Sequence, residues 1–179
     1  MIHSYLAASL PWLELEQAPP MSLEGLATQC EGVLSNDALS DVQRLVRGQA
    51  VGMRTEPGRR WQNLETQLKN ASAARRRPRE DLAQPFFEGY SVVVRDCVRR
   101  AFNAATPLER ERILDRCRFA LLSDIASDAP LGLERILSFA GQLHLVHRWF
   151  RWDEDTGRER FDNLVSTMAE DVLSRKQVR

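Results

Sequence analysis

The sequence has few cysteines, almost no lysine, no surplus of either charge and no long apolar run. Its three cysteines, Cys30, Cys97 and Cys117, are far apart and form no Cys-X-X-Cys pair, so we expect no zinc site. Unpaired thiols are typical of a reducing compartment. A helix that crosses a bilayer needs roughly 18 or more consecutive apolar residues, and none occurs. These absences predict a cytoplasmic protein without direct membrane insertion.

The charges of the chain balance. There are 25 Lys and Arg residues against 25 Asp and Glu residues, and only Lys69 and Lys176 are lysines. A dedicated nucleic-acid-binding protein usually has a basic excess, so nucleic acid is not the expected partner. The sequence also has no Walker loop, no G-X-G-X-X-G motif and no nucleophile elbow. We therefore predict no enzyme activity, no catalytic residue, no cofactor and no metal.

Hydrophobic spacing predicts an all-α fold, an irregular bundle of about seven helices that forms one domain over residues 1–179. A weak lobe boundary is expected near 48–58, where glycines loosen the chain and Glu56-Pro57-Gly58 predicts a turn. The segment Tyr5–Leu10 is either a short strand or a buried first turn. The expected helices cover about 22–34, 40–46, 59–77, 85–104, 106–128, 133 to a turn at Asp155–Gly157, and 159–174.

Local signals mark several helix ends. Ser22 is an expected N-cap, and Ser40 with Gln43 resembles a capping box. The strongest signal is Thr106-Pro107-Leu108-Glu109, which combines an N-cap threonine, a proline at the first helical position and a glutamate at the third. The helix from 133 has apolar residues at three-and-four spacing, which predicts one buried stripe: Leu133, Ile136, Leu137, Ala140, Leu143, Val146, His147 and Phe150.

Two groups of polar residues could indicate chemistry. His144 and His147 are three apart on one helix, a spacing that suits a metal, but no third ligand is apparent. The preferred interpretation is that both are packed or hydrogen-bonded at a helix interface. Asp124 and Asp128 lie at an expected helix end, so they are interpreted as structural.

Arginine clusters are the best polar signal for partner binding. They could form a positive face that contacts an acidic protein or a phosphate backbone, or solvated helix faces paired with Glu65, Glu80, Asp81 and Asp96. The candidate partner-binding residues are Arg59, Arg60, Arg75, Arg76, Arg95, Arg99 and Trp152.

Four segments of the chain match a known pattern. They are the opening Tyr5–Pro11 (YLAASLP), the helix start Pro20–Glu24 (PMSLE), Trp61–Leu64 (WQNL) leading to Asn70, and Leu133–Trp149 followed by Gly157 and Phe161. Together they resemble a bacterial family of unknown-function proteins encoded beside the subunits of V/A-type ATPases. That family is similar to a reduced form of the ATPase C subunit, whose eukaryotic counterpart is the d subunit.

The resemblance implies a non-catalytic role. The C subunit is all-helical, sits as a socket on the membrane rotor ring, receives the central stalk and binds no nucleotide. It would make this chain a coupling component in ion transport, peripheral to the inner membrane through the complex. Asn63, Leu64 and Leu68 would then be helix-core or lobe-joining positions. The chain is much shorter than the C subunit, which implies a minimal replacement, an accessory factor or a homodimer. The alternative is a helical nucleic-acid-associated or regulatory module that uses the arginine face.

Overall fold

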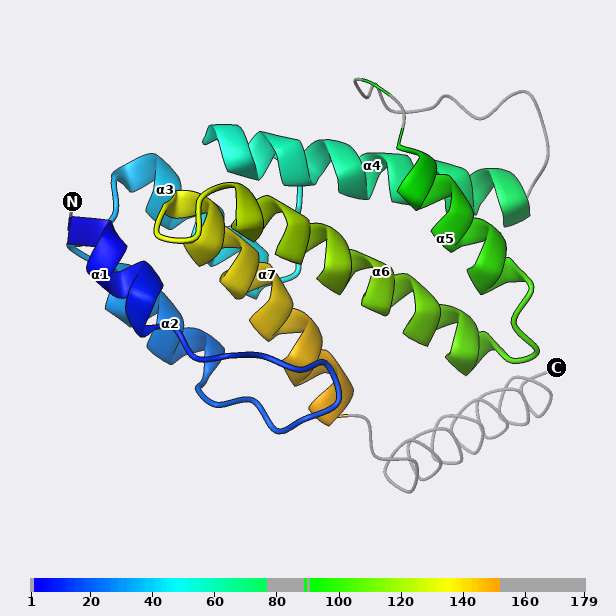
Figure 1. The fold of residues 1–179 in the computed structure, drawn as a ribbon, viewed down its shortest axis with the longest axis horizontal. Helices are drawn as coiled ribbons and strands as arrows, with labels where there is room; N and C mark the ends of the chain where they lie inside the picture. Colours follow the sequence, from blue (N-terminus) through cyan, green and yellow to red (C-terminus); the bar gives the residue numbers. More distant parts are fainter. Residues whose placement is uncertain (1, 77–88, 90, 152–179) are drawn as a thin grey trace, which may run out of the picture.

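A computed structural model of the protein describes residues 2–76, 89 and 91–151. Within these residues every regular element is a helix, and the helices form an irregular bundle (Figure 1). The predicted all-α fold class is confirmed. The helices are α1 (Ile2–Ser9), α2 (Leu23–Cys30), α3 (Asn36–Val46), α4 (Glu56–Arg76), α5 (Val92–Phe102), α6 (Pro107–Asp128) and α7 (Leu133–Phe150).

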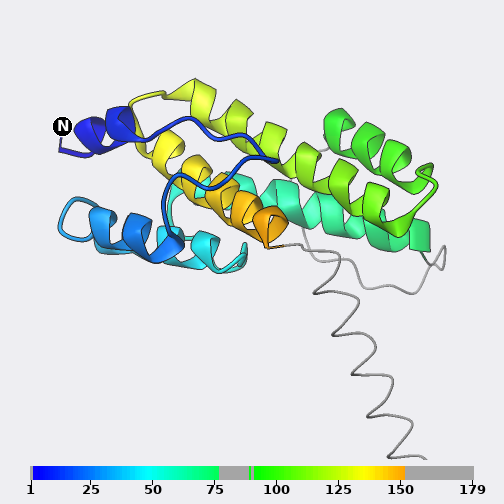
Figure 2. The ribbon, with the colours of Figure 1, turned by 90° about the horizontal axis from the view of Figure 1, so that it is seen from below.

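Helix α7 is the centre of the bundle. It packs most extensively against α6 and α3 and also touches α1, α2 and α4; Figure 2 shows it between α6 and the α2–α3 pair. Every residue from Ile136 to Val146 except His144 is buried, so the predicted single stripe is too narrow. Phe150, predicted to belong to that stripe, is 63% exposed because it is the last residue of the helix, beyond the packed segment.

Two predicted N-caps are confirmed. Ser22 Oγ accepts a hydrogen bond of 2.9 Å from the Gly25 N–H at the start of α2. At the start of α6 the capping box is complete, because the Glu109 N–H donates to Thr106 Oγ1 and the Thr106 N–H donates to the Glu109 carboxylate. These reciprocal bonds satisfy donors that a helix start otherwise leaves unpaired.

The first three helices differ from the prediction. The segment that includes Tyr5 is helical from Ile2 to Ser9, so the opening is not the short strand that was one of the two predicted alternatives. Helix α2 ends at Cys30, short of the predicted 34, before Gly32 adopts a φ of 73°. Helix α3 begins at Asn36 because Ser35, rather than the predicted Ser40, accepts the capping bond from Ala38 N.

The predicted starts of α4 and α5 also differ from the structure. Glu56-Pro57-Gly58 is the first turn of α4, where a proline is tolerated because its missing N–H has no helical partner. Helix α5 begins at Val92, because Ser91 is extended and caps the helix by accepting from Val94 N; the predicted helix from 85 falls partly outside the described residues, which exclude 85–88 and 90. The predicted final helix over 159–174, the turn before it and Trp152 lie outside the described residues.

None of the helices in the described part of the chain combines the length and the apolar character that crossing a membrane requires.

Candidate functional site

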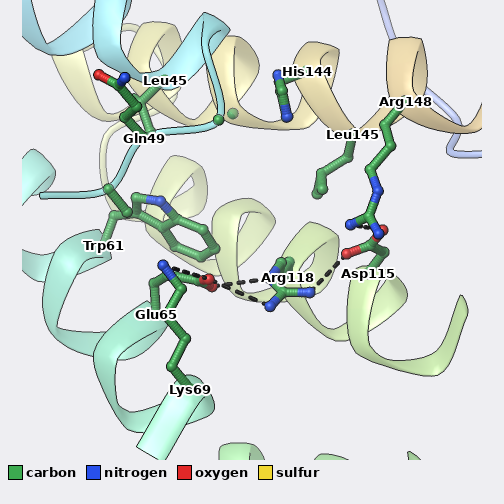
Figure 3. A pocket seen from close by; sticks show the side chains of 13 residues that line it. Leu45, Gln49, Trp61, Glu65, Lys69, Asp115, Arg118, His144, Leu145 and Arg148 are labelled. Carbon is green, nitrogen blue, oxygen red and sulfur yellow. Dashed lines mark hydrogen bonds and ion pairs between the residues drawn. The ribbon is translucent and has the colours of Figure 1, made fainter. Parts of the chain in front are cut away.

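A cavity of about 180 Å³ opens between the α3–α4 connection and helices α4, α6 and α7 (Figure 3). Trp61 and Glu65 reach it from α4, Arg118 and Asp115 from α6, and His144 from α7. These side chains come from distant parts of the sequence, so no local motif could have predicted their meeting.

The floor of this cavity is an ion network, defined here as Glu65, Arg118, Asp115 and Arg148. Arg118 binds the Glu65 carboxylate through two nitrogens, Nε to Oε2 at 2.9 Å and Nη2 to Oε1 at 3.3 Å. Its Nη1 donates to Asp115 Oδ1 at 2.7 Å. The other Asp115 oxygen accepts from Arg148 Nη1 at 2.9 Å. The network therefore joins α4, α6 and α7 through charges of both signs.

Burial makes this network stronger than a surface ion pair. The Asp115 side chain has no exposed area and Glu65 only 9%, and charges removed from water interact more strongly than exposed ones. Burial by itself would lower the pKa of Arg118, but the Glu65 and Asp115 carboxylates outweigh it and raise the pKa above its ordinary value. Arg118 therefore stays charged, as the pairing needs.

Asp115 is the most heavily bonded member of the network. Besides its two arginine partners, it accepts a 2.9 Å hydrogen bond from the Trp149 indole N–H. Its oxygens thus serve three donors, which leaves little room for the proton transfers of an acid–base catalyst. The geometry favours a bracing role between α6 and α7.

The two histidines of α7 bind different parts of the backbone. His144 Nδ1 lies 3.0 Å from the Val46 carbonyl, and His147 Nε2 lies 2.8 Å from the Met21 carbonyl. A carbonyl only accepts, so each of these ring nitrogens donates. This confirms the prediction that both histidines are hydrogen-bonded at helix interfaces. In the described part of the chain no three His, Cys, Asp or Glu side chains gather as metal ligands would.

A third buried carboxylate, Asp41 of α3, binds the two residues directly before α4. It accepts from the Arg54 N–H at 2.9 Å, from the Thr55 N–H at 2.9 Å and from the Thr55 hydroxyl at 2.7 Å. Negative charge at a helix N-terminus is stabilised by the unpaired N–H groups there. Asp41 therefore fixes the 47–55 connection that forms one wall of the cavity.

The six predicted partner-binding arginines in the described residues all lie exposed on α4 or α5. Arg59 and Arg60 lie near the start of α4, whereas Arg75 and Arg76 are in its last turn. At 1.5 Å per residue, the two pairs are about 24 Å apart. On α4, therefore, the structure places these arginines in two separate groups.

Several of these arginines pair with acids. Arg60 bonds Asp128 at the end of α6, and Arg76 Nη2 lies 3.8 Å from Glu111. Asp96 pairs with both Arg95 and Arg99, at 3.5 and 3.6 Å, as the solvated-face interpretation predicts. Exposed pairs of this kind contribute little stability. Glu80 and Asp81 lie outside the described residues.

A second cavity, of about 360 Å³, lies between the loop after α1, the end of α6 and the start of α7. Trp12 borders it and is 79% exposed; Tyr5 on α1 and Leu131 in the α6–α7 turn are also exposed. Arg135 reaches the Pro11 carbonyl at 3.2 Å, and partial burial lowers the pKa of its guanidinium. This end of the bundle thus presents large apolar side chains to solvent.

Sequence reasoning missed the buried acids Asp41 and Asp115. The available signal was their position within amphipathic helices. Asp41 is directly followed by the buried Val42, and Asp115 is directly preceded by the buried Leu114. A charged residue at such a place is rarely buried without partners. Its partners could not be identified, because they come from other helices.

A family of proteins of unknown function is similar to part of the chain. The family described as protein of unknown function (DUF2764) matches residues 91–172, a region that starts at the cap of α5 and includes α6 and α7. The 133–149 segment of the predicted resemblance lies inside this region, whereas the YLAASLP opening and the Trp61 segment lie outside it. No curated protein matches the chain. No solved structure matches it either. The chain is therefore similar, over this region, to a family of unknown function.

Proposed function

We propose that this chain is a non-catalytic interaction protein, a component of a bacterial V/A-type ATPase that is similar to the C subunit and links the central stalk to the membrane rotor ring. The resemblance of the opening segment and of the 133–149 segment motivates the ATPase assignment. The all-helical architecture is compatible with it. In this proposal the protein stays peripheral to the inner membrane and reaches it through its partners.

The ion network is the observation that supports a mechanical role most directly. A component that transmits torque must keep its helices in register under load. Arg118 binds one carboxylate on α4 and one on its own helix, and Arg148 extends the chain of charges to α7. Sliding any of these helices would separate buried charges, which is costly in a poorly solvated site. The network thus resists shear between three helices.

The exposed arginines of α4 and α5 are the proposed docking residues for acidic surfaces of the partner subunits. Charged groups at an interface set orientation and association rate more than affinity. The alternative function, a nucleic-acid-associated or regulatory module, needs the same arginines to follow one phosphate backbone. Because these arginines are separated along α4 and several of them pair with acids, they fit one continuous phosphate backbone less well than separate acidic protein surfaces.

Co-purification tests the proposal. The tagged full chain, recovered from detergent-solubilised membranes, should bring down central-stalk and rotor-ring subunits identified by mass spectrometry. Arg75→Glu should weaken this recovery, whereas Arg47→Glu serves as a matched control because Arg47 is also an exposed arginine at a helix end. An intact ATPase complex that elutes without the chain would contradict the assignment. A salt-sensitive gel shift would support the nucleic-acid alternative instead.

A further inference from the structure

Helices α5 and α6 form a hairpin, joined by the short 103–106 connection, and each contributes one buried cysteine to the contact between them. Cys97 lies on α5 with no exposed area, and Cys117 lies on α6 with 7% of its area exposed. Both sulfurs are free thiols in the structure. The mechanical role proposed above uses neither of them.

One contact of Cys97 and the direction of the α6 side chains bring the two cysteines toward the same turn of α6. Cys97 Sγ lies 3.7 Å from the carbonyl oxygen of Ile113, one helical turn before Cys117. Side chains of a helix tilt toward its N-terminus, so the Cys117 side chain is directed toward that same turn. Both side chains are therefore directed at the same turn of α6, within the contact between α5 and α6.

We propose that Cys97 and Cys117 are a redox-active pair that a peroxide oxidises to an intramolecular disulfide joining α5 to α6. Nineteen residues separate the two cysteines in sequence. A bridge across them would fasten the hairpin and restrict the unfolded chain. This inference does not depend on the ATPase assignment.

The groups around the two cysteines indicate which thiol attacks the oxidant and which one resolves the intermediate. The neighbouring Cys117 thiol, aided by the positive charges of Arg100 and Arg118 against the effect of burial, lowers the pKa of the Cys97 thiol. The neighbouring Cys97 thiol and burial raise the pKa of the Cys117 thiol. Because the thiolate is the nucleophile, Cys97 is the residue that attacks first and Cys117 the one that resolves. Helix α5 has only 11 residues, and local opening of so short a helix would admit the oxidant.

The reaction balances with hydrogen peroxide as the oxidant. The Cys97 thiolate attacks one peroxide oxygen, the O–O bond breaks, and the departing hydroxide takes a proton to become water, which leaves a sulfenic acid on Cys97. The Cys117 sulfur then attacks the Cys97 sulfur and the S–O bond breaks. The hydroxide leaves as a second water with the Cys117 proton. The two sulfurs together lose two electrons, and the peroxide gains them.

Alkylation and mass spectrometry of the full chain test this directly. After hydrogen peroxide treatment, unfolding and iodoacetamide, the chain should take up one alkyl group, on Cys30, instead of three. Peptide mapping should link Cys97 to Cys117, and dithiothreitol should restore all three alkylation sites. Cys30 is a suitable internal control because it lies on α2, away from the hairpin.

Variants separate this pair from general oxidation. Cys30→Ser should form the bridge as the native chain does. Cys117→Ser should form no bridge and should instead accumulate a sulfenic acid on Cys97 that dimedone traps. Three alkylated cysteines after peroxide, a bridge that includes Cys30, or over-oxidation of Cys97 without a bridge in the native chain would each overturn the proposal.

Discussion

Asp115→Asn is the sharpest test of the ion network. The substitution keeps the size of the side chain but removes the negative charge that lies between Arg118 and Arg148. Removing one partner of a buried pair typically costs about 3–5 kcal/mol, because the remaining charge is left uncompensated. Arg118 retains Glu65, and Arg148 is partly exposed, so we expect a loss near the lower end, about 3 kcal/mol.

Urea unfolding followed by far-UV circular dichroism measures this loss. A loss of that size in a chain of this length corresponds to a fall in Tm of roughly 6–12 °C. Asp124→Asn is the matched control, because Asp124 lies on the same helix, α6, but is exposed. Surface substitutions of this kind usually change stability by about 0.5 kcal/mol or less.

An Asp115→Asn protein as stable as the Asp124→Asn control would contradict a stabilising role for the ion network. The network would then not brace α6 against α7, and the proposed mechanical role would lose its structural basis. A large loss in both variants would point to a general effect of charge on α6 instead.

Three further predictions concern local features. Gly58→Ala should destabilise the protein by roughly 2 kcal/mol, although alanine is the better helix former, because its Cβ would lie 2.5 Å from the anchored carboxylate of Asp41; urea unfolding measures the sign. Thr106→Ala removes the capping box of α6 and should cost about 1 kcal/mol in the same assay. Burial raises the pKa of the Cys30 thiol from 9.0 to about 11, so its contribution to stability is full below pH 9.0 and is lost as the pH rises through about 11. Unfolding free energies measured across that range should therefore fall more steeply for the native chain than for Cys30→Ala.

The sequence predicts the helices best where the signal is local. The capping box at Thr106 depends on two residues only three apart, Thr106 and Glu109, and the structure contains both of its hydrogen bonds. The start of α3 is harder to predict because Ser35 and Ser40 both offer a hydroxyl, and the choice between them depends on how α3 packs. Hydrophobic periodicity also underestimates how many residues of α7 are buried, because a helix surrounded by several neighbours has no single apolar stripe.

The candidate site is much harder to predict from the sequence. Glu65, Asp115 and Arg148 are brought together by three helices, and contacts over such sequence distances leave no spacing to recognise. Without their partners these residues resemble ordinary solvated charges. The same holds for Cys97 and Cys117, whose contact depends on the register of the α5–α6 hairpin.

We propose that the chain couples moving parts of an ATPase without performing chemistry. The most direct measurement compares membrane vesicles from cells with and without the chain, recording ion pumping per ATP hydrolysed. We predict that ATP hydrolysis continues in the absence of the chain while pumping falls, and that adding back the native protein restores pumping. Unchanged pumping by a fully assembled ATPase that lacks the chain would contradict this claim.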